Sequence, residues 1–428
     1  MMETKLADAR SGEDSFLTDD FLRQLMSVGE ADIIVGLPTL DNAKTISPIL
    51  DAIQTGLVRF FPRDRAAIIN ADAGSHDGTR ELAMAAAIDD VRRNSKVSAL
   101  RTLHSISTQY DPSEGSALRS FLAAAELLRP RACAVISPDA THITPDWIAN
   151  LLQPVYRESC DLVLPTYSRH KFDGILSTNL LYPMTRAIYG LRIREPYAAE
   201  FAFSGHLAND FMSQHSWREE TARIGCETYF TATAITGGYR VCQSFLGVKD
   251  RTEARPADLV PAIRRTVGAL FASLEPTFSS WSTRKGSHSI PTTGTEGEFT
   301  LEPLPINRTR LREMFASGVA ELESVFRSIL SPATLAELQR IAPREDAYYS
   351  AELWAKTIYE FAAAFHKSVI NRDHIIQALA PLFRGRALTF LVENEQSTAA
   401  GVENNIEGLC LEFERWKPYL LELWQDGE

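Results

Sequence analysis

The feature that most constrains the fold is a repeated alternation of short apolar runs with segments of helical periodicity. Each run is short enough for a buried strand, and the segments between the runs place Ile, Leu and Ala at helical spacing. Strands joined by helices of about ten or more residues need crossover connections, which build a largely parallel sheet covered by helices on both faces. The expected strands span 32–39, 66–72, 97–104, 132–137 and 160–165, and the expected helices span 44–58, 80–91, 115–128 and 145–156.

Polar side chains stand at the ends of three of these runs. They are Pro38-Thr39 with Asp41, then Asp72 with Gly74-Ser75, and finally Ser137-Pro138-Asp139. Each group alone is also compatible with an ordinary helix cap. Because the carboxyl ends of parallel strands share one edge of the sheet, the three together favour a ligand crevice there.

The residue types at these strand ends indicate what the crevice binds. Backbone N–H groups in a Gly-Ser turn before a helix suit anionic or hydroxyl-rich ligands. A carboxylate just beyond a strand can hold a divalent cation or a ribose hydroxyl. No G-x-G-x-x-G follows the first strand and no Walker loop occurs, which disfavours a Rossmann dehydrogenase and a P-loop protein.

Composition fits a soluble protein with one large core and a second, smaller domain. The chain has 428 residues, of which 45% are hydrophobic and 23% charged. Its formal charge of -11 disfavours nucleic acid as a partner. No apolar stretch reaches the roughly 18 residues of a membrane span, and residues 1–20 are too charged for a signal peptide. We therefore expect no transmembrane segment and a cytoplasmic location.

The five cysteines lie far apart in the sequence and form no C-x-x-C pair. This spacing disfavours a zinc site and predicts reduced core thiols of a cytosolic protein. The cysteines are Cys133, Cys160, Cys226, Cys242 and Cys410.

Changes in composition divide the chain into four parts. An N-terminal extension spans 1–30, and the α/β domain spans 31–274. Residues 275–305 are rich in Ser, Thr and Gly without apolar periodicity, which predicts a linker or a loop that closes as a lid. From 306 to 428 apolar residues recur every three or four positions, which predicts a helical domain that packs on the sheet or forms a homo-oligomer interface.

Several segments carry a family resemblance. Residues 34–46, 70–79, 114–119 and 137–140 resemble the successive nucleotide-sugar motifs of GT-A glycosyltransferases of the family 2 type. Residues 167–174, 182–196, 200–205 and 225–228 resemble the mannosylglycerate synthase and glucosyl-3-phosphoglycerate synthase group. The resemblance covers about 32–274 and implies a GT-A sheet. It also implies retaining transfer of a hexose from a nucleotide-diphosphate sugar to a small anionic acceptor such as glycerate or 3-phosphoglycerate.

The resemblance places the donor on the first strands. Pro38, Thr39 and Asp41 would line the nucleobase pocket, and Asp72 would accept a hydrogen bond from the base. Gly115 and Ser116 would lie near the nucleotide, where relatives carry a lysine that this chain lacks.

A metal site is implied by the same resemblance. Ser137-Pro138-Asp139 replaces the family's D-x-D, so that Ser137 would face the ribose and Asp139 a divalent metal, Mg²⁺ or Mn²⁺. Relatives also use a histidine after the late strand, but residues 246–251 contain none. Asp250 is an oxygen ligand that could substitute for it.

The predicted acceptor site follows the strand at 160–165. It consists of Arg169, His170, Lys171 and Asp173. Such a basic loop is often only a solvated surface. As an anion clamp, its Arg fork would match a carboxylate or phosphate, and Asp173 would orient a hydroxyl group. Arg186, which lies in a helix-like stretch, is expected to be structural.

Two later carboxylates, Glu200 and Glu227, are the candidate catalytic residues. Both are flanked by small and apolar side chains, where burial would raise the pKa of an acid and suit it to act near an acceptor hydroxyl. For Glu227, which opens a predicted helix at 228–235, the alternative is an acid that stabilises the helix N-terminus.

Two alternatives stay open at this stage. One is a family 2-like transferase that acts on a polysaccharide or lipid acceptor. The other is a nucleotide-sugar-binding protein that has lost catalysis. Two features support this alternative, the serine at position 137 and the absence of a histidine from residues 246–251.

Overall fold

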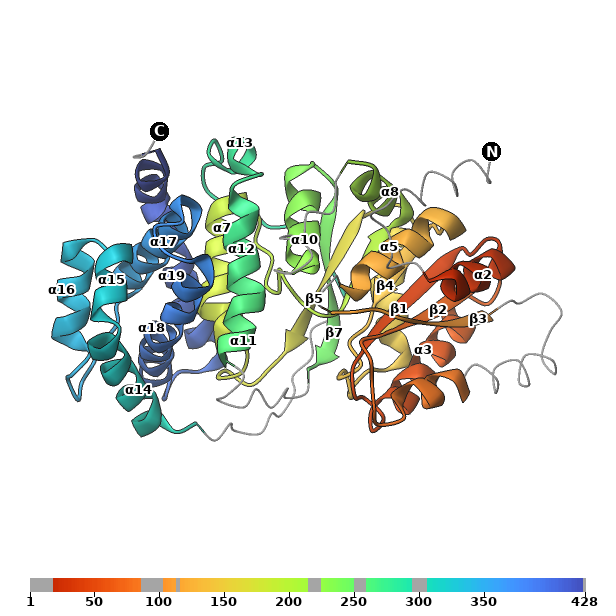
Figure 1. The fold of residues 1–428 in the computed structure, drawn as a ribbon, viewed down its shortest axis with the longest axis horizontal. Helices are drawn as coiled ribbons and strands as arrows, with labels where there is room; N and C mark the ends of the chain where they lie inside the picture. The colour runs from red at the N-terminus through yellow and green to blue at the C-terminus, as the bar shows by residue number, and fades with distance from the viewer. Residues whose placement is uncertain are drawn as a thin grey trace.

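The computed structural model describes residues 18–85, 103–112, 116–214, 225–249, 259–294 and 306–425. A sheet with helices on both faces occupies the right-hand half of Figure 1, and a bundle of helices occupies the left-hand half. The predicted class, a mostly parallel α/β sheet followed by a C-terminal helical region, is therefore confirmed.

The sheet has eight strands in the order β3-β2-β1-β4-β6-β5-β7-β8. Only β6 among the described strands runs antiparallel to its neighbours, β4 and β5. The strands are β1 (Ile33–Thr39), β2 (Ala66–Asp72), β3 (Leu103–Gln109), β4 (Ala132–Val135), β5 (Leu162–Ser168), β6 (Phe201–Ser204), β7 (Val241–Val248) and β8 (Thr292–Thr293).

Alternation of apolar side chains along the strands builds a core on each face. In β1, Ile33 and Val35 point toward α3 (Ile46–Phe60) and α6 (Pro145–Tyr156). Ile34 points the other way, toward α5 (Ala117–Leu128), α8 (Gly205–Gln214) and α10 (Cys226–Thr236). Gly36 shares this second face, where any Cβ would lie 2.6 Å from the ring of Phe121 in α5. This glycine lets α5 pack close to the central strand.

The bounds of two strands differ from those predicted from the sequence. The described part of the strand expected at 97–104 belongs to β3, which spans Leu103–Gln109, and residues 86–102 lie outside the described part of the chain. The strand expected from residue 160 begins at Leu162 and runs on to Ser168. The apolar runs thus locate these strands to within a few residues, as their ends carry little hydrophobic signal.

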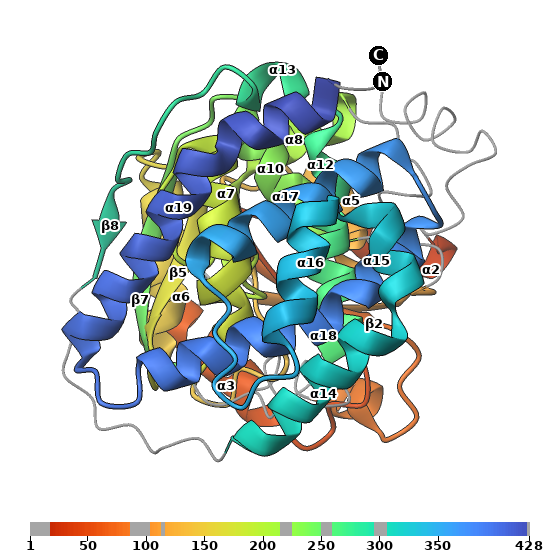
Figure 2. The same ribbon diagram turned by 90° about the vertical axis from the view of Figure 1, so that its left-hand side faces the viewer.

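A helical layer joins the sheet to the C-terminal bundle. This layer contains η1 (Ser177–Leu181), α7 (Tyr182–Tyr189), α11 (Leu259–Ile263), η3 (Arg264–Gly268) and α12 (Ala269–Leu274). The bundle contains α14 (Arg308–Glu321), α15 (Glu323–Ile329), α16 (Pro332–Ile341), α17 (Ala351–Lys367), α18 (Arg372–Glu393) and α19 (Ala399–Gln425). Figure 2 shows α19 lying across α7, and a single apolar cluster continues from Met184 of α7 to Trp354 and Phe413 of the bundle.

A buried arginine fixes this junction. Arg186 of α7 has no exposed surface, and its Nη2 donates to Glu407 of α19 at 2.8 Å. Its Nε donates to Glu414 of α19 at 2.6 Å. The expectation that Arg186 is structural is confirmed, because both of its carboxylate partners come from the helical region.

Helix α18 is the one described helix that is long and apolar enough to cross a membrane. Within its 22 residues, an 18-residue window reaches a mean hydropathy of 1.3, but 83% of that window is buried inside the protein. It also carries the buried Arg386, whose Nη1 donates to the carbonyl oxygen of Tyr349 at 3.0 Å. In this structure α18 is the core helix of the bundle.

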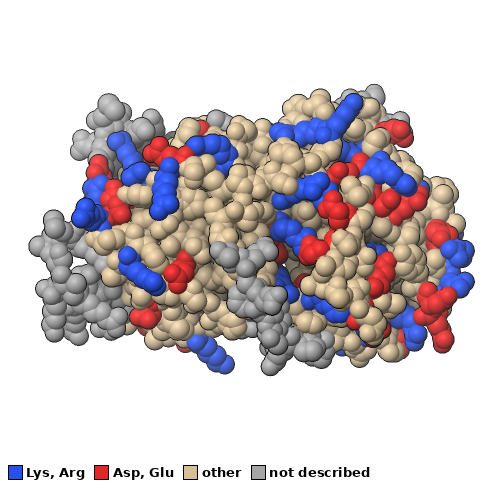
Figure 3. Space-filling view, turned by 180° about the vertical axis from the view of Figure 1, so that it is seen from behind, with Lys and Arg blue, Asp and Glu red and all other residues tan. Residues whose placement is uncertain are grey.

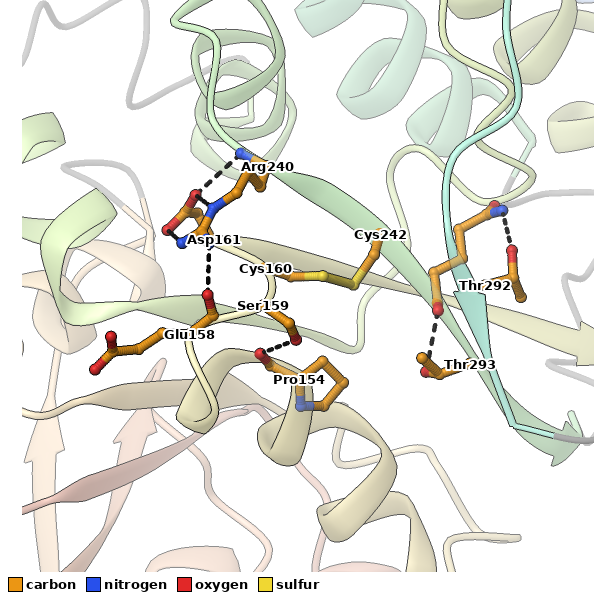
Figure 4. The surroundings of a disulfide bond; sticks show 10 residues. Pro154, Glu158, Ser159, Cys160, Asp161, Arg240, Cys242, Thr292 and Thr293 are labelled. Carbon is orange, nitrogen blue, oxygen red and sulfur yellow. Dashed lines mark hydrogen bonds and ion pairs between the residues drawn. A yellow bond between two sulfur atoms is a disulfide. The ribbon is translucent and has the colours of Figure 1, made fainter.

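The cysteine prediction is wrong for two residues. Cys160, just before β5, and Cys242, in β7, form a disulfide with their Cα atoms 6.1 Å apart (Figure 4). They are separated by 82 positions in the sequence, and only the pairing of β5 with β7 brings them together. Cys133, Cys226 and Cys410 are free and buried. Because disulfides persist in oxidising compartments, the cytoplasmic location loses its support from reduced cysteines.

Part of the predicted linker is packed. Residues 275–294 include α13 (Phe278–Trp281) and β8, which pairs with β7. Trp281 is fully buried, and its Nε1 donates to the carbonyl oxygen of Leu274 at 2.8 Å. Residues 295–305 lie outside the described part of the chain.

Candidate functional site

The candidate site lies where the strand order of the sheet reverses. From β1 the chain continues outward through β2 to β3, whereas β4 returns to the opposite side of β1. Ligands of open α/β sheets bind at such a switch point, outside the carboxyl ends of the strands. Asn42, in the loop after β1, donates from Nδ2 to Oδ1 of Asp139, in the loop after β4, at 3.0 Å. This bond bridges the two loops at the switch point.

The loops after β1 and β2 hold each other in place. The backbone N–H of Asp41 donates to Oγ of Ser75 at 2.9 Å, and Oδ1 of Asp41 accepts from the N–H of His76 at 2.9 Å. The N–H of Asn42 donates to Oγ1 of Thr79 at 2.7 Å. Asp41 has φ of 54°, a left-handed conformation that is uncommon outside glycine and that Asn and Asp adopt more readily than other residues. These reciprocal bonds hold the Asp41 backbone in that conformation at the rim of the site.

Asp72 organises the turn after β2. Its carboxylate is buried, with 1% of the residue exposed. Oδ1 accepts from the N–H groups of Gly74 and Ser75 at 3.0 and 2.8 Å, and Oδ2 accepts from the hydroxyls of Ser75 and Thr39 at 2.6 and 2.9 Å. A carboxylate has about four acceptor positions. The predicted bond from a nucleobase would therefore have to replace one of these.

Asp139 is an exposed carboxylate of the site. It follows the half-buried Ser137, whose Oγ accepts from the N–H of Asp139 at 3.2 Å. The described residues contain no group of three His, Cys, Asp or Glu side chains placed to hold a metal. Mg²⁺ usually needs only one or two protein carboxylates when substrate phosphates supply further ligands. Asp139 fits that requirement, and the second predicted ligand, Asp250, lies outside the described residues.

A second group of side chains surrounds the start of α5. Ser116 caps this helix, accepting from the N–H of Leu118 at 3.1 Å, and its hydroxyl donates to Oε1 of Glu227 at 2.7 Å. Glu227 lies in the first turn of α10, the helix N-terminus that is the alternative reading for this residue, and it also contacts Ser116, a predicted donor residue. Gly115 lies outside the described residues.

Tyr110 belongs to this second group, although sequence reasoning missed it. It directly follows β3, and its N–H donates to the carbonyl oxygen of Asp72 at 3.0 Å. Burial, together with the nearby charges of Glu227 and Asp72, raises the pKa of Tyr110 to about 12. Its phenol therefore stays protonated at neutral pH. The sequence feature that could have identified Tyr110 is its position at the end of a strand, at the same edge of the sheet as Asp72.

Glu200 forms a third group with two residues that the sequence did not single out. It directly precedes the antiparallel β6, so it lies at the same edge as the carboxyl ends of the other strands. Its Oε2 accepts from the hydroxyl of Tyr167 at 2.6 Å and from Nζ of Lys249 at 2.8 Å. Burial, followed by the charge of Glu200, raises the pKa of Tyr167 well above its ordinary value.

Arg169 is the predicted acceptor residue whose donors remain partly unused. It pairs with Glu195 at 3.1 Å, and both side chains are largely buried. Its Nε is buried and has no hydrogen-bond partner within the described structure. Gly174, at φ of 65°, lies so close that a Cβ would be 2.8 Å from Nη1 of Arg169. Asp173 accepts at Oδ1 from the N–H of Gly174 at 2.8 Å, which helps to shape this loop.

The contacts of Lys171 argue against its predicted place in the anion clamp. Its Nζ donates to the carbonyl oxygens of Asn394, Glu395 and Ser397 at 2.8, 2.8 and 3.1 Å. Since an ammonium group has three donors, all of them bind the turn between α18 and α19. Nδ1 of the neighbouring His170 accepts from the N–H of Phe172 at 3.3 Å, within the loop. The structure thus assigns Lys171 to the junction with the helical region.

Comparison with known proteins finds likeness among solved structures. No family model and no curated protein matches the chain. Glucosyl-3-phosphoglycerate synthase from Mycobacterium tuberculosis, in complex with Mn²⁺, UDP and phosphoglyceric acid, is 20% identical, with a TM-score of 0.43 over 60% of this chain and 82% of that chain. The complex with Mn²⁺, UDP and glucosyl-3-phosphoglycerate is 21% identical, with a TM-score of 0.44 over 63% and 91%.

A third structure of that synthase, in complex with Mg²⁺ and UDP, is 19% identical, with a TM-score of 0.42 over 60% of this chain and 83% of that chain. The roles proposed for its residues rest on its own contacts and on the motif resemblance of its sequence.

Proposed function

We propose that this protein is a GT-A type glycosyltransferase that transfers a hexose from a nucleotide-diphosphate sugar. The observation that carries the proposal is the bond between Asn42 and Asp139, which places an exposed carboxylate at the switch point of the sheet. The motif resemblance of the segments around Asp41, Asp72 and Asp139 to family 2 type transferases supports the same assignment.

In this proposal the donor lies along the carboxyl edge from β2 to β4. Pro38, Thr39 and Asp41 line the nucleobase side, and Ser137 faces the ribose. Asp139 anchors a divalent metal together with the diphosphate. The metal, when bound, neutralises negative charge on the leaving diphosphate. Asp72 keeps the loops after β1 and β2 in the shape that receives the nucleotide.

The proposed acceptor is a small hydroxy acid of the glycerate type. Arg169 supports this, because a guanidinium with a buried, unused Nε can donate to a carboxylate. Lys171 takes no part, since its three donors bind the junction. Glu227, held by the Ser116 hydroxyl, is proposed to accept a hydrogen bond from the acceptor hydroxyl. Transfer with retention is proposed on the resemblance alone.

Donor binding is tested first. Titration calorimetry with UDP-, GDP- and ADP-sugars, each with and without Mn²⁺, should give saturable binding of at least one donor. The failure of all three to bind would refute the proposal.

Acceptor use is tested next, with the donor that binds. Transfer to glycerate and to 3-phosphoglycerate is measured by release of the nucleoside diphosphate. We expect turnover with one of these acceptors that depends on Arg169. Donor binding without turnover on any acceptor would instead identify a nucleotide-sugar-binding protein that lacks catalysis.

A further inference from the structure

A lysine and a buried glutamate form an ion pair at the carboxyl edge of the sheet. The pair lies on the side of β4 that is opposite to the proposed nucleobase pocket. We propose that Lys249 binds the diphosphate of the donor and that Glu200 and Tyr167 hold its ammonium group in position. This inference rests on the proposed function, and it adds a residue for the leaving group that the motifs did not indicate.

The strand pairing places this ion pair next to the proposed diphosphate position. Lys249 directly follows β7, and its N–H donates to the carbonyl oxygen of Ser168, the last residue of β5, at 3.2 Å. In the β4–β6 pair, Val135 lies opposite Phe201. Glu200 therefore lies beside the chain that leaves β4 and reaches Asp139 four residues beyond Val135. The ammonium and the exposed carboxylate thus share one part of the edge.

The ammonium is held from two sides. Nζ of Lys249 lies 2.8 Å from Oε2 of Glu200 and 4.6 Å from the centroid of the Tyr167 ring. The same Oε2 accepts the Tyr167 hydroxyl at 2.6 Å. The Glu200 side chain is 2% exposed and that of Lys249 is 18% exposed. A buried ion pair with a shared acceptor and an aromatic wall fixes the position of the charge better than a surface lysine could.

The ammonium keeps donors for a ligand. Of its three N–H groups, the described structure uses one, on Glu200. Lysine is a common phosphate ligand that acts as a point charge. A donor diphosphate held at Asp139 would bring its oxygens toward these remaining N–H groups. Charge that develops on the leaving diphosphate would then be stabilised by a cation already in place.

This arrangement changes the role predicted for Glu200. Both of the bonds described for its carboxylate involve Oε2, and they tie it to Tyr167 and Lys249. Glu200 is then a positioning residue, which acts on the donor through Lys249. Glu227 remains the candidate near the acceptor.

The test compares nucleotides that differ only in the diphosphate. The ligands are the nucleoside diphosphate and the nucleoside of the base that the wild type binds, both with Mn²⁺. Calorimetry measures the affinity of each ligand for the wild type, Lys249→Met and Lys249→Arg. Met keeps an unbranched stem against Tyr167 and removes the charge. We expect Lys249→Met to weaken diphosphate binding about 10- to 100-fold, as for loss of a hydrogen bond to a charged group. Nucleoside affinity should stay unchanged, and Lys249→Arg should restore part of the loss.

The positioning role predicts coupling between the two residues. Glu200→Gln should weaken diphosphate binding in the wild-type background but add little in the Lys249→Met background. The matched control is Lys356→Met, since Lys356 also pairs with a glutamate, Glu352, at 2.7 Å and lies over a ring, that of Trp416, at 3.8 Å. It lies in the helical region and should leave nucleotide binding unchanged.

The outcomes separate the inference from the function on which it rests. If the wild type binds no nucleotide, the proposed function fails and the inference with it. If the wild type binds and Lys249→Met binds the diphosphate equally well, the inference alone is overturned. Equal losses of diphosphate and nucleoside affinity would also overturn it, because they would indicate a general disturbance of the site. Thermal unfolding of each variant verifies that it is folded.

Discussion

Reducing the bond between Cys160 and Cys242 should destabilise the protein by an amount that follows from the structure. The bond closes a loop across 82 positions, from before β5 to β7. In the chain-entropy treatment, removing a crosslink over such a loop costs about 4.5 kcal/mol at 25 °C. With an unfolding entropy of about 0.9 kcal/mol/K for a chain of this length, the midpoint of thermal unfolding should fall by about 5 °C.

The assay is thermal unfolding followed by circular dichroism, with and without dithiothreitol. Mass spectrometry after alkylation counts the free thiols in each sample. Cys160→Ala should show a lowered midpoint that no longer responds to the reductant. Cys133→Ala, at a buried free cysteine in β4, is the matched control, and its midpoint should still fall on reduction. Equal midpoints for oxidised and reduced wild type would refute the reasoning.

Three further predictions concern the junction and the acceptor loop. Arg186→Met should destabilise the protein by about 1–3 kcal/mol in chemical unfolding, because it leaves the largely buried Glu414 without its cation, whereas Glu407 is 42% exposed and stays screened by water; a loss under about 0.5 kcal/mol would argue against a fixed junction. Gly174→Ala should raise the acceptor KM with little change in kcat, since its Cβ would displace the Arg169 guanidinium, and an unaltered KM would remove Arg169 from the acceptor site. Burial lowers the pKa of Lys417 to about 8. Between about pH 8 and pH 10 the unfolded chain therefore binds more protons than the folded protein, and the free energy of unfolding should rise with pH. Lys417→Met should abolish this part of the rise when the free energy of unfolding is measured against pH.

The sequence predicts the central strands β1, β2 and β4 well because these strands are buried on both faces. A run such as Ala66–Asp72 is apolar until its last residues, and this marks both the strand and the edge where it ends. Asp72 and Asp139 were found for the same reason. Asp72 ends β2 and Asp139 follows β4, and these positions at the carboxyl ends of parallel strands indicate a shared edge before any contact is known.

What the sequence could not predict depends on strands that are neighbours only in space. Cys160 and Cys242 meet because β5 pairs with β7, and Lys249 meets Glu200 because β6 runs antiparallel to β5, the strand that also pairs with β7. Lys171 has a surface-like sequence context, yet the turn after α18 folds back to occupy its donors. These pairings depend on the strand order and on the docking of the bundle, neither of which leaves a local pattern.

The central claim is that Asp139 anchors the donor through a divalent metal at the switch point of the sheet. The most direct measurement is the calorimetric affinity for the preferred nucleotide-diphosphate sugar, with and without Mn²⁺, for wild type, Asp139→Asn and Asp146→Asn. Asp146 is the matched control, an exposed aspartate in the first turn of α6. We predict that Asp139→Asn abolishes the increase in affinity that Mn²⁺ produces, and that Asp146→Asn preserves it. Equal responses to Mn²⁺ in wild type and Asp139→Asn would contradict the account.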